Sequence, residues 1–183
     1  MNKFINFIAF QIIWFIAVIG AANDILWPTM VAVCVFCAWQ LAPSRRHSND
    51  VPLIIFALIF GLIFDSFWQL SGLITYKLAL PMIAPIWILL LWITLALSMN
   101  HSLAWLKRNN WFPIFFGAIG APASYYAGNR LGALSYPNDA FYISLLLSIS
   151  WAFVMYFFVH YERLFQRKAL QQRAMHKKAE GQK

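Results

Sequence analysis

The sequence predicts an all-α fold, a polytopic transmembrane helix bundle with six spans and both termini in the cytoplasm. Hydrophobic residues make up 62% of the 183-residue chain and charged residues only 11%, whereas soluble domains have about 45–50% and about 25%. Water could not solvate so apolar a surface, and one core of this size could not hide it. The chain also contains apolar runs of membrane length, and its basic residues fall mostly on alternate loops.

The apolar runs define the predicted spans, because a helix needs roughly 20 apolar residues to cross a hydrocarbon layer of about 30 Å. Backbone amides inside lipid must be paired within the segment, and the runs lack the alternation of barrel strands, so helices are expected. Ser48, Asn49 and Asp50 offer N-cap oxygens ahead of Pro52. Pro28, Pro81 and Pro113 are expected near span starts in the same way. The predicted spans are 4–22, 25–42, 52–73, 78–99, 111–132 and 138–161.

The orientation follows from the basic residues in the short loops, since positive charge is retained on the cytoplasmic side. One side carries Lys3, Arg45, Arg46, Lys107, Arg108 and the tail from Arg163 onward. Only Lys77 and Arg130 fall on the other side. The sequence therefore predicts a multi-pass protein of the bacterial inner membrane.

The first span has a competing interpretation as a cleaved secretory signal. Lys3 precedes an apolar run that ends in small residues at Gly20, Ala21 and Ala22, as a signal peptide would. The run exceeds the roughly 7–15 residues of a signal core. An uncleaved first helix is therefore expected, and cleavage would leave five spans.

The third span places a carboxylate inside a helix. Gly61, Asp65, Trp68 or Gln69, and Gly72 share one face at helical spacing. A charge at that depth costs about 2.5–3.5 kcal/mol on insertion scales, so Asp65 is expected to face the bundle interior or a wet cavity. It lies in the outer half of the span and needs a partner, or it is protonated.

The fifth span supplies the expected partner, Arg130. Small residues recur at every fourth position before and after it, and such a ridge lets another helix approach closely. We expect a polar cavity open toward the periplasm with Asp65 and Arg130 at its centre. The predicted packing residues are Gly120, Ser124, Gly128 and Gly132, and the candidate ligand-binding residues are Asp65, Arg130, Gln69, Trp68, Tyr125 and Asn129.

Two interpretations of this pair stay open. Asp65 and Arg130 either form a salt bridge that joins two helices, or handle a ligand or a proton; Arg130 could also extend to lipid headgroups. No catalytic residue is identified.

The tail from 162 to 183 is predicted as a basic cytoplasmic segment after the bundle of residues 1–161. Basic side chains there should bind anionic lipid headgroups, at about 1 kcal/mol for each one near the membrane. The tail lacks the aromatic residues that nucleic-acid binding uses. The basic residues that follow the last span are Arg163, Arg167, Lys168, Arg173, Lys177 and Lys178.

Cofactor and metal motifs are not found in the sequence. The histidines His47, His101, His160 and His176 include no two at metal-ligand spacing on one helix. No phosphate-binding glycine loop, nucleophile elbow or zinc-protease motif occurs. We predict no metal and no cofactor.

The segment around Asp65, Gly-x-x-x-Asp-Ser followed by Trp and Gln, together with the later Gly-Asn-Arg-Leu-Gly around Arg130, resembles an uncharacterised family of small six-span bacterial inner-membrane proteins. The resemblance covers nearly the whole chain and implies no known activity. More loosely, Gly61, Asp65 and Gly72 are similar to the pattern of the rod-shape-determining membrane subunit MreD. Size and span number resemble the substrate-binding components of energy-coupling-factor vitamin transporters.

Two classes of function follow from these features. The first is a non-enzymatic binding or interaction subunit, with a periplasmic pocket for a lipid headgroup or small solute and a possible membrane-protein partner. The second is a membrane-embedded enzyme acting on a lipid, with Asp65 as acid or base and Arg130 holding phosphate or carboxylate. The chain lacks a second evident catalytic carboxylate and a nucleophile-base pair, which favours the first class. A small transporter component is a further alternative, although inverted repeats are not evident.

Overall fold

The computed structural model describes residues 3–136 and 140–180, and within them it is built from helices. This confirms the predicted all-α class. The two strands are two residues long each and form the only sheet of the described chain. In chain order the elements are α1 (Lys3–Ala22), α2 (Trp27–Gln40), α3 (Asp50–Leu70), β1 (Thr75–Tyr76), α4 (Ile86–Met99), the 3₁₀ helix η1 (Ala104–Arg108), α5 (Trp111–Arg130), β2 (Leu134–Ser135) and α6 (Ala140–Glu180).

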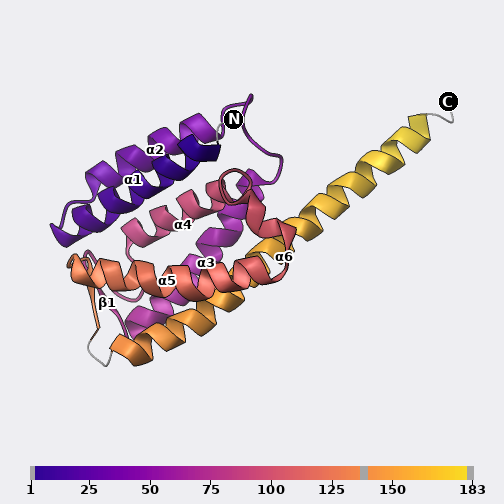
Figure 1. Ribbon diagram of the computed structural model, residues 1–183. Helices are drawn as coiled ribbons and strands as arrows, with labels where there is room; N and C mark the ends of the chain where they lie inside the picture. Colours follow the sequence, from indigo (N-terminus) through magenta and orange to yellow (C-terminus); the bar gives the residue numbers. More distant parts are fainter. Residues whose placement is uncertain (1–2, 137–139, 181–183) are drawn as a thin grey trace.

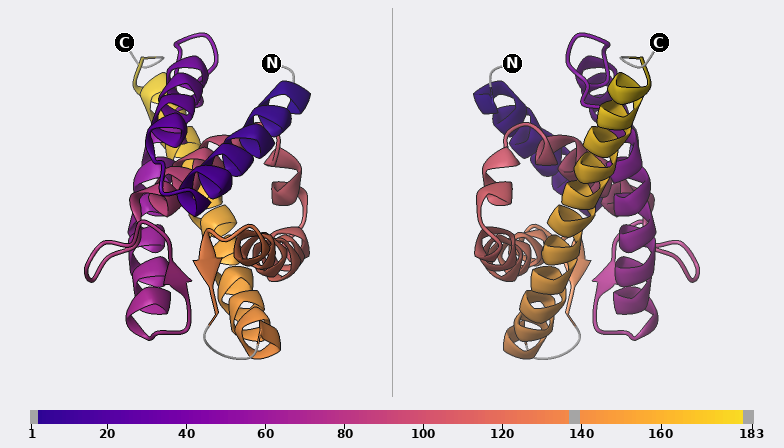
Figure 2. Two further views of the ribbon diagram at one scale, coloured as in Figure 1. Left: turned by 90° about the vertical axis from the view of Figure 1, so that its left-hand side faces the viewer. Right: turned by 90° about the vertical axis from the view of Figure 1, so that its right-hand side faces the viewer.

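The helices run up and down a bundle in alternating directions (Figure 1). α1, α3 and α5 begin at the end of the bundle where the N-terminus lies, and α2, α4 and α6 run back toward that end. α4 packs against α1, α2 and α3, while α5 packs mainly along α6. Figure 2 shows α6 crossing the bundle, and Figure 1 shows it continuing beyond the other helices. The loops that join the helices are therefore gathered at two opposite ends.

Three described helices are long and apolar enough to cross a membrane: α1, α3 and the part of α6 from Ala140 to Phe165. α2 and α4 are apolar but have 14 residues each, about 21 Å at 1.5 Å per residue. That is shorter than a hydrocarbon layer of about 30 Å. α5 has the predicted length of a span, with 20 residues, but a more polar composition. The molecule thus has the helices of a membrane protein, with unequal lengths.

The fourth helix begins later than the sequence predicted. A span was expected over 78–99, yet α4 starts at Ile86. Pro85 occupies the N-cap position with extended backbone, φ −65° and ψ 148°, and proline also disfavours helix in the residue before it. Pro81 was therefore not at a helix start. The residues before α4 form a loop instead.

That loop is held against the end of α3 by side-chain hydrogen bonds. The Gln69 amide Nε2 donates to the Leu80 carbonyl over 2.7 Å, and the Ala84 N–H donates to Ser66 Oγ over 2.8 Å. Leu78 and Met82 have positive φ of 54° and 82°, which is uncommon without glycine. Two α3 side chains thus bond backbone groups of a non-helical segment.

The last helix is longer than predicted. A span was expected over 138–161 with a separate tail, but α6 continues without a break to Glu180. Its final turns project away from the bundle (Figure 1). The basic segment therefore begins as a direct extension of the last helix. The predicted tail residues 181–183 lie outside the described residues.

Glycine turns end both α3 and α5. Gly72 and Gly132 have φ of +70° and +85°, a conformation in which glycine carries no steric cost. Immediately after these turns, β1 and β2 pair antiparallel, with Tyr76 opposite Leu134. The pairing holds β1 beside the C-terminal ends of both helices. Tyr76 is thereby placed within the bundle, 3% exposed.

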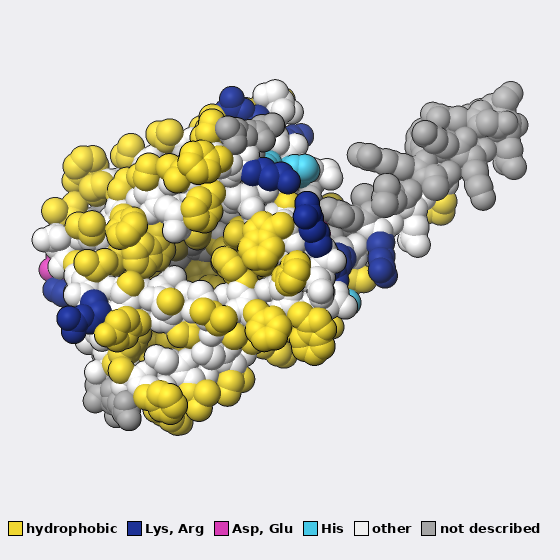
Figure 3. All heavy atoms as spheres, in the orientation of Figure 1, with side chains coloured by type: hydrophobic (Ala, Val, Ile, Leu, Met, Phe, Trp, Pro, Cys, Tyr) yellow, Lys and Arg dark blue, Asp and Glu magenta, His cyan; other side chains and the backbone are white. Residues whose placement is uncertain are grey.

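The surface between the two ends of the molecule is strongly apolar. Figure 3 shows hydrophobic side chains covering the visible face, with Lys and Arg gathered toward its ends. Ile119 on α5 is 69% exposed and Ile149 on α6 63%. Soluble monomers rarely carry contiguous apolar patches larger than a few hundred Å². This surface suits contact with lipid.

Candidate functional site

Asp65 lies at the centre of a buried hydrogen-bonded cluster. The side chain is fully buried on α3. Its Oδ1 accepts from the Tyr76 hydroxyl over 2.8 Å and from the Tyr125 hydroxyl, and its Oδ2 accepts from the Trp92 indole Nε1 over 2.7 Å. The donors come from β1, α5 and α4. One carboxyl group thus connects four elements of the bundle.

Gly61 explains how Trp92 reaches this carboxyl group. Gly61 precedes Asp65 by one helical turn, and a Cβ placed on it would lie 2.5 Å from Trp92 Cδ1 and 2.8 Å from Nε1. Real Cβ atoms do not approach other atoms so closely. The absence of a side chain at Gly61 therefore provides the space for the indole. The Gly-x-x-x-Asp spacing has a direct structural meaning in this protein.

Aromatic rings enclose the cluster on the sides of α4 and α6. The Trp92 indole stacks on Trp151, with ring centroids 4.7 Å apart and an interplanar angle of 17°. Tyr125 meets Trp151 edge-on at 6.4 Å, and Tyr76 meets Trp87 edge-on at 6.2 Å. Such contacts add about 0.5–1.5 kcal/mol each beyond burial. Each of the three donors to Asp65 is consequently fixed by a contact with a tryptophan ring.

The expected ion pair between Asp65 and Arg130 does not form. Arg130 is exposed at the end of α5, and the Asp65 oxygens accept from Tyr76, Trp92 and Tyr125 instead. Arg130 follows Tyr125 by five residues, which at 3.6 residues per turn places it roughly 140° around the helix. Asp65 and Arg130 were expected to pair because they lie at similar depth along their helices, but Arg130 is on a different face of α5 from Tyr125, which bonds Asp65. The predicted polar cavity centred on this pair is therefore wrong.

The other predicted ligand-binding residues have separate surroundings. Trp68 is 4% exposed and its indole Nε1 has no hydrogen-bond partner among the described residues. Gln69 bonds the loop before α4. Asn129 is partly buried, with no side-chain hydrogen bond within the described chain. Of the six candidates, the structure brings together only Asp65 and Tyr125.

Sequence reasoning missed Tyr76 and Trp92. Trp92 lies in the middle of the apolar run of α4, where a buried indole N–H requires an acceptor. That requirement could have indicated from the sequence that Trp92 bonds a buried polar group. Tyr76 gave no such signal, because its position depends on the pairing of β1 with β2.

A groove of about 310 Å³ opens beside the cluster, between α1 on one side and α5 on the other, with α4 and α6 behind (Figure 3). Trp92 and Tyr125 belong to its wall. These two side chains separate the groove from Asp65, to which both are bonded. The remaining wall is almost wholly apolar; its polar side chains beyond the aromatic ones are Gln11 and Ser124. Much of the lining is supplied by Phe7, Phe10, Trp14, Leu91, Phe116 and Leu95.

The small residues of α5 line this groove and do not all pack against a helix. A Cβ on Gly120 would have no heavy atom within 4 Å outside its own helix, and Ser124 is exposed. Gly128 packs against β2, since a Cβ placed on it would lie 3.3 Å from Leu134 Cδ2, while Gly132 forms the turn after α5. The close approach of α5 to α6 occurs at Gly117, against the Trp151 carbonyl. The prediction of close helix packing is therefore wrong at Gly120.

A second buried polar network lies at the opposite end of the bundle, around Asp50 at the start of α3. Asn100 Nδ2 donates to Asp50 Oδ1 over 2.7 Å, and His101 Nε2 lies 3.5 Å from Asp50 Oδ2. His101 also bonds Gln40 over 2.6 Å. Asp50 and Gln40 are fully buried. This network ties the start of α3 to the end of α2 and to the loop after α4.

The network extends to α1 and α6 through two further links. Asn6 Nδ2 donates to Gln40 Oε1 over 3.1 Å. Lys107 Nζ donates to Glu162 Oε1 over 3.0 Å, and Glu162 is fully buried on α6. This network was not predicted from the sequence, because polar residues at span ends are ordinarily exposed to headgroups. Residues from every loop at this end are thus joined by hydrogen bonds.

His47 lies beside this network in the loop before α3. Its ring centroid is 4.8 Å from that of His101. Partial burial first, and then the proximity of His101, lower the pKa of His47 below its ordinary 6.5. The neutral form of His47 is therefore favoured in the folded protein.

The described part of the chain contains no group of three or more His, Cys, Asp or Glu side chains arranged to hold a metal ion. A family model for a protein of unknown function matches residues 3–157. No curated protein and no solved structure matches the chain, and the looser resemblances to MreD and to energy-coupling-factor components are not shown.

Proposed function

This chain belongs to DUF2878, a family of proteins of unknown function, and we propose that it is a non-enzymatic membrane protein that binds a lipid chain in the groove between α1 and α5. The observation that carries this proposal is the groove itself. It is apolar, it is lined in part by α1 and α6, which are long enough to cross a membrane, and it opens on the apolar face of the bundle. Sites for small molecules have volumes of roughly 300–1,000 Å³ and mainly hydrophobic walls.

The proposed setting is a bacterial inner membrane, with six helices embedded and both termini in the cytoplasm. The loops 41–49 and 100–110 lie with the N-terminus at one end of the bundle, and these loops hold most of the basic loop residues. The opposite end has Lys77, paired with Asp24 over 3.1 Å, and Arg130. The excess of positive charge supports placing the first end in the cytoplasm. The short helices α2 and α4 would then require extended segments at membrane depth, which are tolerated where protein covers them.

A lipid chain fits the groove better than a polar solute. The entrance lies between exposed side chains of α1 and α5, including Phe7 at 44%, so the surrounding solvent would be acyl chains. A polar solute would lose its hydration there and find few hydrogen-bonding groups. The open space at Gly120 and Ser124 provides room for a chain to lie against α5. A lipid chain is therefore the occupant that costs least to insert.

The position of Asp65 argues against the alternative of an enzyme acting on lipid. A general acid or base must come within hydrogen-bonding distance of its substrate. Asp65 has no exposed surface, and Trp92 and Tyr125 stand between it and the groove. Its bonds to three donors indicate a structural role instead. The polar pocket for a headgroup, expected around Asp65, is replaced in this proposal by an apolar groove.

Lipid retention in groove-filling variants tests the proposal. We would purify wild type, Gly120→Leu and Ser124→Leu in a mild detergent and quantify copurified lipids by mass spectrometry. The leucine side chains should occupy the groove, so the amount of lipid per protein should fall several-fold. Folding should be unaffected because both positions have open space.

The matched control is Ala123→Leu. Ala123 is exposed on α5 next to Ser124 but does not line the groove. This variant adds the same side chain to the lipid-facing surface and should retain as much lipid as wild type. Unchanged retention in Gly120→Leu and Ser124→Leu, with normal thermal stability, would show that the groove is not the binding site.

A further inference from the structure

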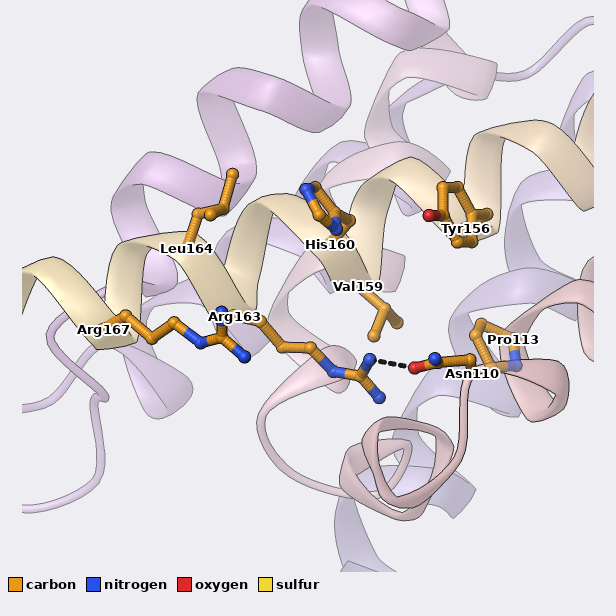
Figure 4. Close-up of a pocket in the computed structure, with 8 residues that line it drawn as sticks. All are labelled: Asn110, Pro113, Tyr156, Val159, His160, Arg163, Leu164 and Arg167. Atoms are coloured by element: carbon orange, nitrogen blue, oxygen red, sulfur yellow. Dashed lines mark hydrogen bonds between the residues drawn. The ribbon is translucent and has the colours of Figure 1, made fainter.

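A second cavity lies where α6 passes the start of α5, at the end of the bundle that carries most of the basic loop residues (Figure 4). Its volume is about 260 Å³. Figure 4 shows Arg163 and Arg167 extending from α6 along one side, with Asn110 and Pro113 facing them. The cavity is distinct from the groove described above, with which it shares no lining residue.

Arg163 is held in position by two acceptors. Its Nη2 donates to the Lys107 carbonyl over 2.7 Å, and its Nη1 donates to the Asn110 side-chain oxygen. A guanidinium has five N–H groups in a planar fork. Two of its nitrogens are thus fixed by the segment between η1 and α5, and the other N–H groups have no partner among the described residues. The guanidinium is oriented in advance of any ligand.

The cavity is positively charged and contains no carboxylate. His160, Arg163 or Leu164, and Arg167 recur at helical spacing, so they share one face of α6. No Asp or Glu lines the cavity. The nearest acid in sequence, Glu162, is buried and bonded to Lys107 over 3.0 Å. An anion would therefore meet two arginines without an opposing charge.

We propose that this cavity binds the phosphate group of an anionic phospholipid. The apolar part of α6 ends at Phe165, so Arg163 and Arg167 lie where the hydrocarbon region gives way to headgroups. Trp105 and Trp111, which are 42% and 62% exposed, lie at the same end, as expected for residues at a membrane interface. Arginine suits phosphate because its fork can donate two parallel hydrogen bonds. The inference depends on the proposed membrane insertion but not on lipid in the groove.

Phosphatidylglycerol binding tests this site. We would titrate purified protein in neutral detergent with phosphatidylglycerol and count bound molecules by native mass spectrometry. Arg167→Gln should weaken the tightest binding event about tenfold, as loss of a charge-assisted hydrogen bond would. Arg163→Gln should do the same or more. Arg167 makes no hydrogen bond among the described residues, so its replacement should leave the fold intact.

The matched control is Arg46→Gln, which removes the same charge from a loop at the same end. It should leave phosphatidylglycerol binding unchanged. Equal loss in Arg46→Gln, or no loss in folded Arg167→Gln, would overturn the proposal. Displacement of phosphatidylglycerol by millimolar inorganic phosphate would show that the site takes soluble phosphate, which would also overturn the assignment to lipid. Retention of groove lipid in Arg167→Gln would separate this result from the proposed function.

Discussion

The indole N–H of Trp92 donates to the carboxyl group of Asp65 over 2.7 Å, across the interface between α4 and α3. The contact requires that Gly61 carry no side chain, since a Cβ there would lie 2.5–2.8 Å from atoms of the Trp92 ring. The hydrogen bond of buried Asp65 therefore depends on Trp92, and the position of Trp92 depends on Gly61. This relationship makes the stability of the bundle depend on a glycine that contacts no ligand.

Replacing Gly61 by alanine should destabilise the protein by about 1–3 kcal/mol, because the new methyl group would displace Trp92 from a well-packed position. Thermal unfolding in detergent measures the effect. Gly120→Ala is the matched control. Its methyl group enters open space and should leave stability unchanged or raise it by up to about 1 kcal/mol, the difference in helix propensity. Equal behaviour of the two variants would contradict the role given to Gly61.

A double-mutant cycle distinguishes the partners of Asp65. Asp65→Asn and Tyr125→Phe should show a coupling energy of about 0.5–3 kcal/mol, because the two side chains are hydrogen-bonded. Asp65→Asn and Arg130→Gln should be additive, since these side chains do not interact. Chemical or thermal unfolding of wild type, the three single variants and the two double variants supplies the energies. Coupling to Arg130 comparable with that to Tyr125 would mean that the observed cluster is not the stable arrangement.

Asn100 should matter far more than Asn129. Asn100→Leu removes donors to Asp50 Oδ1 and Asn49 Oδ1, which leaves buried acceptors unsatisfied at a cost of about 1–3 kcal/mol each. Asn129→Leu removes no side-chain hydrogen bond of the described structure. The midpoint of thermal unfolding should fall clearly for the first variant and little for the second. A similar midpoint in both would indicate that water replaces the lost bonds around Asp50.

Acidification should weaken the bundle through His47. Its pKa is lowered from 6.5 in the folded protein, so below that pH the unfolded chain binds a proton that the folded chain resists. Stability should therefore fall as the pH drops from 6.5 toward the lowered pKa. His101 and Lys107 oppose the added charge, and Asp50 and Glu162 favour it.

The measurement for His47 is the unfolding midpoint between about pH 7 and about pH 5, where histidine titrates. His47→Gln keeps the backbone N–H that bonds Asp50 Oδ2 and should reduce the pH dependence. An unchanged dependence in His47→Gln would assign the effect to other groups. A rise in stability on acidification would contradict the direction of the pKa shift.

The ends of a helix could be predicted from the sequence where they coincide with the ends of an apolar run. α1 begins and ends within one residue of the predicted 4–22, and α5 begins at the predicted residue 111. The start of α4 was not predictable in this way. Whether Pro81 and Pro85 begin a helix or break one depends on the bonds of Ser66 and Gln69 to the intervening loop. Hydropathy carries no information about those bonds.

The candidate site was predicted only in part. A buried carboxylate at Asp65 followed from its apolar neighbours, and Tyr125 was included as a nearby polar residue. The other two partners of Asp65, Tyr76 and Trp92, could not be predicted. Helical periodicity gives the faces of each helix but not the rotation of one helix against another. A rotation of roughly 140° decides whether Arg130 or Tyr125 meets α3. Likewise, the small residues of α5 were predicted to pack closely against another helix. Small side chains are also compatible with open space, and the positions of α1 and α4 leave Gly120 beside the groove.

Photo-crosslinking in reconstituted membranes tests directly whether a lipid chain lies in the groove between α1 and α5. A phospholipid with a diazirine on its acyl chain would be incorporated around wild-type protein, activated by light, and its attachment sites mapped by peptide mass spectrometry. If an acyl chain occupies the groove, labelling should concentrate on groove residues such as Leu91, Phe116 and Ser124, and Gly120→Leu should lose it. Uniform labelling of the exposed faces, with Ile149 and Ile119 as strongly marked as the groove and no change in Gly120→Leu, would contradict it.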